Sequence, residues 1–252
     1  MLERNPDISL ILPAYNEEGR LPATLTAIRD WIEAQTAVCE VIVVDNGSTD
    51  QTVLVAESAM QGFPHFRVLR TDRRGKGLAV RMGALAARGS VVIFGDSDLS
   101  WPVDELGRFP ELISRTTPIA IGSREGHGAR RVGEPIYRHV MGRIFNMIVR
   151  YLAVPGVVDT QCGFKAFRRD AAHAIFERQM IDGFGFDVEL LFLARRFGYD
   201  VREVPLHWEH KDSSRVEPVR DSLRMLMDVL TIRRNSLFGR YARVSSELVP
   251  GV

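Results

Sequence analysis

The stretch CEVIVVDNGSTDQT, residues 39–52, decides the fold class. Its first half, CEVIVVD at 39–45, is an apolar run rich in β-branched residues, which is typical of a strand buried on both faces. NGST follows as a turn, and Ser48 with Gln51 three residues later predicts a capping box at the start of a helix. A buried strand followed at once by a helix indicates an α/β protein with parallel strands.

The same alternation of strand and helix signals runs through the first half of the chain. It implies crossover connections and a mostly parallel central sheet that is covered by helices on both faces. Such a sheet binds its ligands beyond the carboxyl ends of its strands. The other strands are expected at 8–15, 66–70, 91–95 and 118–122, and the helices at 20–35, 76–88 and 103–114.

The second half of the chain departs from this pattern. A Gly-rich, basic loop at 124–135, expected to be mobile, precedes a helical stretch at 136–154. The segments that follow are a loop entering a strand (159–169), a helix that Gly198 stops (186–198), a last strand (200–210) and a helical tail from about residue 216.

Length and composition narrow the class of protein. The 252 residues suffice for one large α/β domain or two small ones, and the formal charge of +1 argues against binding of nucleic acid as the main activity. Cys39 and Cys162 lie far apart without a CxxC spacing, which indicates neither a disulfide scaffold nor a zinc site and fits a reduced, cytosolic setting. No signal-like segment and no apolar run of about 18 residues is visible, so any membrane contact is expected to be peripheral.

Two carboxylates follow an apolar run in VVIFGDSDLS, residues 91–100. Side chains at i and i+2 of an extended chain point the same way, so Asp96 and Asp98 would face one spot. Like charges held together are costly without a positive charge, and the sequence offers this pair no cation other than a bound metal. A hard divalent cation, which prefers carboxylate oxygens, fits the spacing. The alternative is an ordinary turn or helix cap, where Asp is also common.

A second candidate site is RRGKGLAVRMG at 73–83. Glycines on both sides of Lys76, just before a helix, suit contacts from the backbone and the ammonium to a phosphate. The GxxxxGK[ST] and GxGxxG patterns are both absent, and the alternative is a solvated basic turn.

Several segments, in their order along the chain, resemble the family 2 glycosyltransferases of GT-A fold. The later segments resemble the polyprenyl-phosphate branch, most of all the dolichyl-phosphate β-glucosyltransferases, with the mannose synthases as a second match. The resemblance covers about residues 8–235, and DTQCGFK followed by FDVELL is its most specific part. The segments are LPAYNEE, VIVVDNGSTDQT, GKGLAVRMG, DSDLS, IGSRE, DTQCGFKAFRRDAA, FGFDVELL and EVPLHWEHKDSSRV.

The resemblance implies a fold, a reaction and a set of site residues. It implies a Rossmann-like GT-A domain over 1–215 and an amphipathic helical tail over 216–252. The reaction implied is inverting transfer of a hexose, most simply glucose from UDP-glucose, to a polyprenyl or dolichyl phosphate. Asp96 and Asp98 would be catalytic and hold Mg²⁺ or Mn²⁺, and Asp159 matches an acid near the reacting centre. The donor would bind at Pro13, Tyr15, Glu17, Asp45, Lys76, Asp96 and Ser97, and the acceptor phosphate at Arg124, Arg138 and Arg215.

Three departures from the family pattern bear on this assignment. Asn46 stands where relatives carry a second aspartate. Ser100 stands where mannose synthases usually carry Gln, and this second departure favours the glucosyl branch. Residues 213–215 read Ser-Ser-Arg in place of Gly-Ser-Lys, which leaves the role of Arg215 open. The rival readings are a GDP-mannose-dependent synthase, a transferase to a soluble acceptor, a nucleotide-sugar-binding protein without turnover and a nucleotidyltransferase.

A lipid acceptor implies a membrane, so we expect a peripheral protein on the cytoplasmic face. The stretches 136–154 and 216–240 are amphipathic, and the tail has Val219, Leu223, Leu226 and Leu230 on one helical stripe. The alternative is that these stripes pack on the sheet or on another subunit. The sequence leaves the oligomeric state undetermined.

Overall fold

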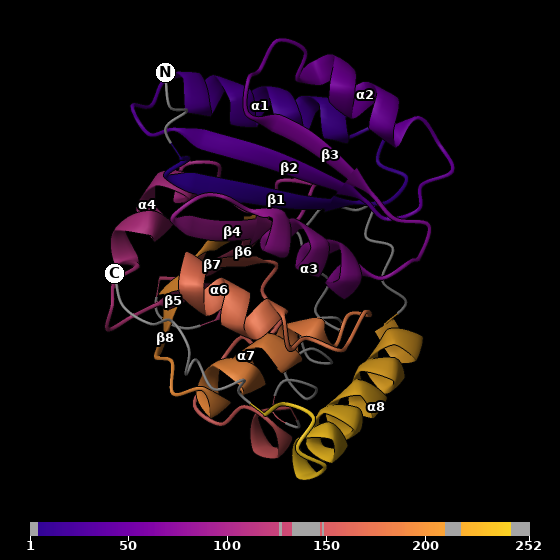
Figure 1. Ribbon diagram of the computed structural model, residues 1–252, viewed down its shortest axis with the longest axis vertical. Coiled ribbons are helices and arrows are strands. Elements are labelled where there is room, and N and C mark those ends of the chain that lie inside the picture. The colour runs from indigo at the N-terminus through magenta and orange to yellow at the C-terminus, as the bar shows by residue number, and fades with distance from the viewer. Residues whose placement is uncertain (1–4, 126–127, 133–146, 148, 210–217, 243–252) are drawn as a thin grey trace, which may run out of the picture.

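The computed structural model of the chain describes residues 5–125, 128–132, 147, 149–209 and 218–242, with the backbone alone at 130–132 and 218–222. A seven-stranded sheet in the order β3-β2-β1-β4-β7-β5-β8 forms its centre (Figure 1). The strands are β1 (Ile8–Ala14), β2 (Cys39–Asp45), β3 (Phe66–Arg70), β4 (Val91–Gly95), β5 (Ile119–Ser123), β6 (Arg130–Val132), β7 (Phe164–Arg168), β8 (Val201–Pro205) and β9 (His207–Glu209).

The predicted α/β fold with a mostly parallel sheet is confirmed. Strands β1 to β4 pair in parallel, as do β5 and β8, and β7 is antiparallel to both of its neighbours. The chain reverses its direction across the sheet between β1 and β4, because β1 pairs with β2 on one side and with β4 on the other. This topological switch point is where open α/β sheets bind their ligands.

Helices cover both faces of the sheet, as the sequence predicts. Side chains alternate along each strand, so Leu10 and Leu12 of β1 pack in one core and Ile11 packs in the other. The first core lies under α1 (Leu21–Glu33), α2 (Thr52–Ala59) and α4 (Glu105–Leu112). The second lies under α3 (Lys76–Ala86), α6 (Arg169–Phe176) and α7 (Phe186–Arg196).

The C-terminal helix α8 (Pro218–Leu237) lies at the far end of the molecule from α1 and α2 (Figure 1). It contacts α7 and contributes the buried side chains Val229 and Ile232 to the second core. The stripe predicted for this helix is divided, since Leu223 and Leu230 are exposed and Leu226 packs against the core. The predicted domain boundary at 215–216 lies outside the described residues.

Several local predictions are wrong. The capping box is absent, because α2 begins at Thr52 and its N-cap position, Gln51, makes no side-chain cap. Ser48 instead accepts a hydrogen bond from the backbone N–H of Asn16 (2.9 Å), which ties the turn after β2 to the loop after β1. The expected strand at 200–210 is split at Leu206, since β8 joins the main sheet and β9 pairs with β6, which lies within the predicted loop at 124–135.

Candidate active site

A cleft of about 810 Å³ opens at the carboxyl ends of β1, β2 and β4, at the switch point of the sheet. Its walls come from the loop after β1, the start of α3, the turn after β4, the turn before α7 and one face of α8. One wall is polar and charged, and the wall formed by α8 is partly apolar. The lining residues are Pro13, Ala14, Tyr15, Glu17, Arg20, Asn46, Arg74, Gly75, Lys76, Asp96, Ser97, Asp98, Gly183, Phe184, Leu223, Arg224, Met225, Met227 and Asp228.

The backbone holds Asp96 at the floor of this cleft. The backbone N–H of Asp96 donates to the carbonyl oxygen of Gly163 (3.1 Å), and its own carbonyl accepts from the indole N–H of Trp101 (3.0 Å). A Cβ at Gly163 would clash with the Asp96 carboxylate, so any residue other than glycine at this position would displace the carboxylate. The loop Asp96–Trp101 is therefore fixed by both its backbone and its neighbours.

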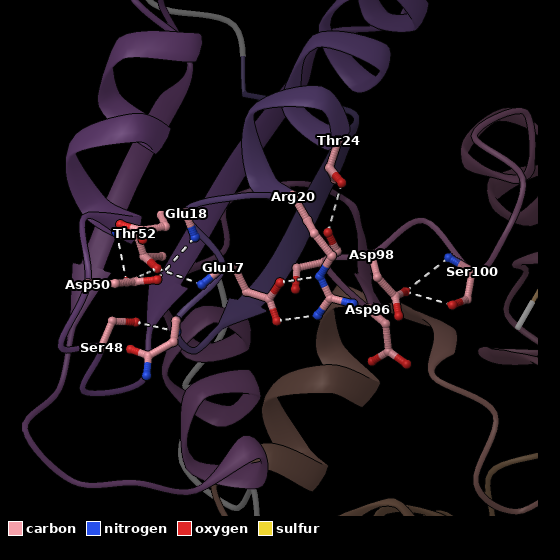
Figure 2. A network of polar contacts seen from close by, with 12 residues as sticks. Glu17, Glu18, Arg20, Thr24, Ser48, Asp50, Thr52, Asp96, Asp98 and Ser100 are labelled. Atoms are coloured by element: carbon pink, nitrogen blue, oxygen red, sulfur yellow. Dashed lines mark hydrogen bonds and ion pairs between the residues drawn. The ribbon is translucent and has the colours of Figure 1, made fainter. Parts of the chain in front are cut away.

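Asp98 is oriented from within the same turn (Figure 2). Its Oδ1 accepts hydrogen bonds from the backbone N–H (3.0 Å) and the hydroxyl (2.7 Å) of Ser100. Leu99 between them adopts a left-handed conformation with φ of 51°. The hydroxyl of Thr24 donates to the carbonyl oxygen of Ser97 (2.8 Å), which ties the turn to α1. The acid pair thus follows from a structured turn and is not a solvated surface feature.

The expectation that only a metal could neutralise the acid pair is wrong. The Lys76 ammonium lies 2.5 Å from Asp96 Oδ1, and both side chains are mostly buried. Burial is the largest single influence on the pKa of Lys76 and would lower it, but the charges of Asp96, Asp187 and Asp98 and the hydrogen bond to Asp96 together raise this pKa. Lysine 76 comes from the start of α3, some twenty residues before the pair, so local sequence gave no sign of the contact.

A second cation, Arg20, points toward the acid pair (Figure 2). Its guanidinium forms a bidentate pair with Glu17, with distances of 2.7 Å to Oε2 and 2.6 Å to Oε1. Glu17 is itself buried, and its backbone N–H donates to the hydroxyl of Thr52 (2.7 Å). The sequence did not single out Arg20, although it stands in the helix start that follows the LPAYNEE segment.

The residues expected to hold the nucleotide gather at this cleft, with one exception. Pro13, Tyr15 and Glu17 line it, and the Arg74 guanidinium lies over the Tyr15 ring at 4.6 Å. Asp45 is buried behind the lining, where its Oδ1 accepts from the backbone N–H of Ser48 (3.3 Å). Lys76, Asp96 and Ser97 also line the cleft.

Asn46, which departs from the family pattern, has a clear structural place. Its side-chain Oδ1 accepts a hydrogen bond from the backbone N–H of Gly75 (2.8 Å), and its backbone N–H donates to the carbonyl oxygen of Ala14 (2.8 Å). It therefore joins the end of β2 to the turn that presents Lys76.

Asp159 and Arg124 form a pair of their own and are not among the residues that line the cleft. The Arg124 side chain binds Asp159 at 2.8 and 2.9 Å, and its backbone N–H donates to the same carboxylate at 2.9 Å. Burial would raise the pKa of Asp159, but the charge and hydrogen bonds of Arg124 hold it well below its usual range. Arg138 and Arg215 lie outside the described residues, and the roles of all four stay predictions.

The two most specific family segments meet in the core below the cleft. Lys165 of DTQCGFK is fully buried and pairs with Asp187 of FDVELL at 2.5 Å, while its ammonium also donates to the carbonyl oxygen of Cys162 (2.7 Å). Glu189 is equally buried and accepts from the backbone N–H of Ile181 (2.8 Å) and the hydroxyl of Tyr241 (2.5 Å). Sequence reasoning assigned these residues no role, although two acids inside an apolar helix are a signal of buried partners.

The acid pair fits a divalent cation that is completed by a ligand. The described residues contain no cluster of three or more His, Cys, Asp or Glu side chains that could enclose a metal by themselves. Asp96 and Asp98 supply two carboxylates at the floor of an open cleft, and Mg²⁺ is often held by one or two carboxylates together with substrate phosphates. The donor set therefore suits Mg²⁺ or Mn²⁺ beside a phosphate-bearing ligand.

The switch-point cleft and the sheet around it place this chain among the α/β proteins of GT-A fold. The chain belongs to glycosyl transferase family 2, whose family pattern, "Glycosyl transferase family 2", matches residues 9–176, and it is a glycosyltransferase. It is 36% identical to the dolichyl-phosphate beta-glucosyltransferase of Drosophila melanogaster over 97% of this chain and 80% of that protein. The human protein of the same name is 34% identical over 93% of this chain and 77% of its own length.

Solved structures show the same fold at lower identity. Glucosyl-3-phosphoglycerate synthase from Mycobacterium tuberculosis, in complex with Mn²⁺, UDP-glucose and phosphoglyceric acid, superposes with a TM-score of 0.65 at 23% identity. The match covers 96% of this chain and 82% of that one. The same enzyme with phosphoglyceric acid alone gives a TM-score of 0.67 over 90% and 80% of the two chains, again at 23% identity.

Proposed function

We propose that this glycosyltransferase moves glucose from UDP-glucose to dolichyl or another polyprenyl phosphate and forms a β-linked lipid-phosphate sugar. The observation that carries the proposal is the pair Asp96 and Asp98 facing Lys76 in a cleft at the switch point. The similarity to dolichyl-phosphate beta-glucosyltransferases supports both the acceptor and the sugar. The apolar side chains of Phe184, Leu223 and Met227, on the same cleft, suit an acceptor with a hydrocarbon chain.

In this reaction an acceptor phosphate oxygen forms a bond to the anomeric carbon, and the bond from that carbon to the UDP oxygen breaks. A divalent cation held by Asp96 and Asp98 would stabilise the charge that develops on the leaving diphosphate. Lys76 adds a second positive charge at the same place, and Tyr15 with Arg74 offers an aromatic and cationic surface for the nucleotide. Inversion follows from attack on the face opposite the leaving group.

The acceptor needs no strong general base. A phosphate monoester has its second pKa near about 6 and is largely dianionic at neutral pH. Asp159 is ionised and fully engaged with Arg124, so we propose that it holds the Arg124 guanidinium in place for the acceptor phosphate. Arg138 and Arg215 are proposed to join the same phosphate site.

The donor is the part of the proposal with a direct rival, GDP-mannose. Calorimetric titration of UDP-glucose and GDP-mannose in Mn²⁺ separates the two. We expect UDP-glucose to bind at least about tenfold more tightly, a difference of about 1.4 kcal/mol. Preference for GDP-mannose would assign the chain to the mannosyl branch, and binding of neither would remove the cleft as a donor site.

Replacement of Gly163 by alanine tests the geometry of the acid pair. The new Cβ would collide with the Asp96 carboxylate and displace it, so the transfer rate should fall about a hundredfold, the scale for a misplacement of about 1 Å. Gly19→Ala is the matched control, because a Cβ there meets nothing within 4 Å. Unchanged transfer by Gly163→Ala, with the variant folded by circular dichroism, would show that the position of Asp96 is not critical.

We further propose that the protein binds the cytoplasmic face of a membrane through exposed apolar side chains of α8 and the turn after it. No helix in the described part of the chain is long and apolar enough to cross a bilayer. Leu230, Leu237 and Phe238 are largely exposed and are not among the residues that line the cleft. Apolar burial and attraction of arginines to anionic lipids add at such a surface.

Liposome co-sedimentation of a triple variant tests the membrane proposal. Removing the whole tail would also remove Val229 and Ile232 from the core, so point substitutions are preferable. Leu230→Glu, Leu237→Glu and Phe238→Glu together should reduce binding to anionic liposomes at least about tenfold, whereas Leu54→Glu, at an exposed position on α2, should leave it unchanged. Wild-type protein that stays in the supernatant at low salt would overturn the proposal.

A further inference from the structure

The protein supplies its own counter-ion at the place where a metal is proposed to bind. The Lys76 ammonium lies 2.5 Å from Asp96 Oδ1, with the two side chains 21% and 25% exposed. We infer that Lys76 competes with the divalent cation for Asp96 and releases this carboxylate when the diphosphate of the donor enters the cleft. The inference rests on the proposed function of the cleft and adds an order of events to it: metal binds well only together with the nucleotide.

The backbone that carries Lys76 is fixed, so its side chain is the part that moves. The Gly75 backbone N–H is held by Asn46, and the Leu78 backbone N–H donates to the Asp182 carbonyl (3.2 Å). A Cβ at Gly77 would clash with the Ile181 carbonyl and with Phe186, so the start of α3 lies directly against the segment before α7. A lysine side chain has a flexible stem of four carbons, so its ammonium can reach a new partner without any change in this packing.

A second carboxylate lies near the ammonium on the core side. Asp187 is buried next to Phe186 in the chain, and it pairs with Lys165 at 2.5 Å. After burial and the charge of Asp96, the charge of Asp187 has the next largest effect on the pKa of Lys76, which it raises. Asp96, Lys76, Asp187 and Lys165 therefore alternate in sign from the cleft into the core.

The balance of charge explains why metal and nucleotide should bind together. With Lys76 in contact, the two carboxylates keep one net negative charge, which a divalent cation alone would reverse to positive. The Lys76 ammonium and a divalent cation that both contact Asp96 in a mostly buried site would repel each other strongly. The diphosphate brings two negative charges, gives the ammonium another anion to contact and offers the metal additional oxygens. Arg20 does not replace Lys76 in this role, because Glu17 already neutralises it.

Titration of Mn²⁺ alone, followed by electron paramagnetic resonance of the free ion, tests the inference. Lys76→Met keeps most of the length of the side chain and removes the charge. Lys76→Gln is measured beside it, so the comparison does not depend on one variant folding. Without nucleotide, both should bind Mn²⁺ at least about tenfold more tightly than the wild type. Arg74→Met, which removes a cleft cation stacked on Tyr15, should change this affinity less than about threefold.

The same titration in the presence of UDP completes the test. UDP should strengthen Mn²⁺ binding to the wild type at least about tenfold, and this coupling should be about tenfold smaller in both Lys76 variants. Mn²⁺ affinity without nucleotide that is equal to or weaker than the wild type in the folded Lys76 variants would overturn the inference. Failure of UDP to bind any of the proteins would instead count against the proposed function. The role of Lys76 would still be decided by the comparison of Mn²⁺ affinities without nucleotide.

Discussion

Asp98→Asn is expected to reduce glucosyl transfer about a thousandfold and leave the fold intact. A divalent cation bound to the leaving diphosphate would stabilise the transition state by several kcal/mol, and each 1.36 kcal/mol changes the rate about tenfold. Asparagine keeps an oxygen that can accept the two hydrogen bonds from Ser100, so the turn should persist while one anionic metal ligand is lost. Steady-state rates and calorimetric titration of UDP-glucose, with and without Mn²⁺, measure the two effects.

Asp104→Asn provides the matched control for this substitution. Asp104 lies six residues further along the same segment and is exposed, at the N-cap position of α4. It should retain nearly wild-type transfer and metal-dependent donor binding. If Asp98→Asn binds UDP-glucose with the wild-type dependence on Mn²⁺, Asp98 is not a metal ligand and the assignment of the acid pair is wrong.

Lys165→Met is expected to destabilise the protein by about 3–5 kcal/mol, the usual cost of breaking a buried ion pair by removing one partner. The Lys165 ammonium is fully buried, binds Asp187 and the Cys162 carbonyl oxygen, and lies 5.5 Å from the centre of the Phe94 ring. Its loss leaves the Asp187 carboxylate buried without its closest cation. Burial already raises the pKa of Asp187, and loss of Lys165 removes the main opposing influence. Denaturant unfolding gives the difference in free energy.

An exposed pair at the end of the same strand serves as the control. Arg168 and Asp170 are 2.6 Å apart, with side chains 29% and 62% exposed, so Arg168→Met should cost less than about 1 kcal/mol. The double variant Lys165→Met with Asp187→Leu should recover much of the lost stability, because both buried charges are then absent. A cost for Lys165→Met as small as that for Arg168→Met would show that the buried pair does not stabilise the fold.

The sheet and the acid pair were predictable because their signals are local. Buried strands such as 39–45 and 91–95 are continuous apolar runs, and Asp96 and Asp98 stand at the end of one of them. Strand β7 was predicted only as a loop that enters a strand, and its antiparallel direction was not predicted, because pairing depends on distant segments. The short strand β6 was missed for the same reason.

The charge partners of the site could not be predicted, because they join segments far apart in sequence. Lys76 was expected to contact a donor phosphate, and its contact with Asp96 depends on how α3 packs beside β4. Lys165 and Asp187 lie 22 positions apart and were quoted only for their resemblance to relatives. The face that α8 turns to the cleft likewise follows from tertiary packing, since a stripe of leucines fits the core and a membrane equally well.

Transfer of labelled glucose from UDP-glucose to dolichyl phosphate, measured with the whole chain in detergent and Mn²⁺, tests the central claim most directly. The proposal predicts a labelled lipid-phosphate product that forms in proportion to enzyme, carries a β-linkage by nuclear magnetic resonance and forms about a thousandfold more slowly with Asp98→Asn. Tight, metal-dependent binding of UDP-glucose with no labelled lipid, or a lipid product formed from GDP-mannose alone, would contradict it.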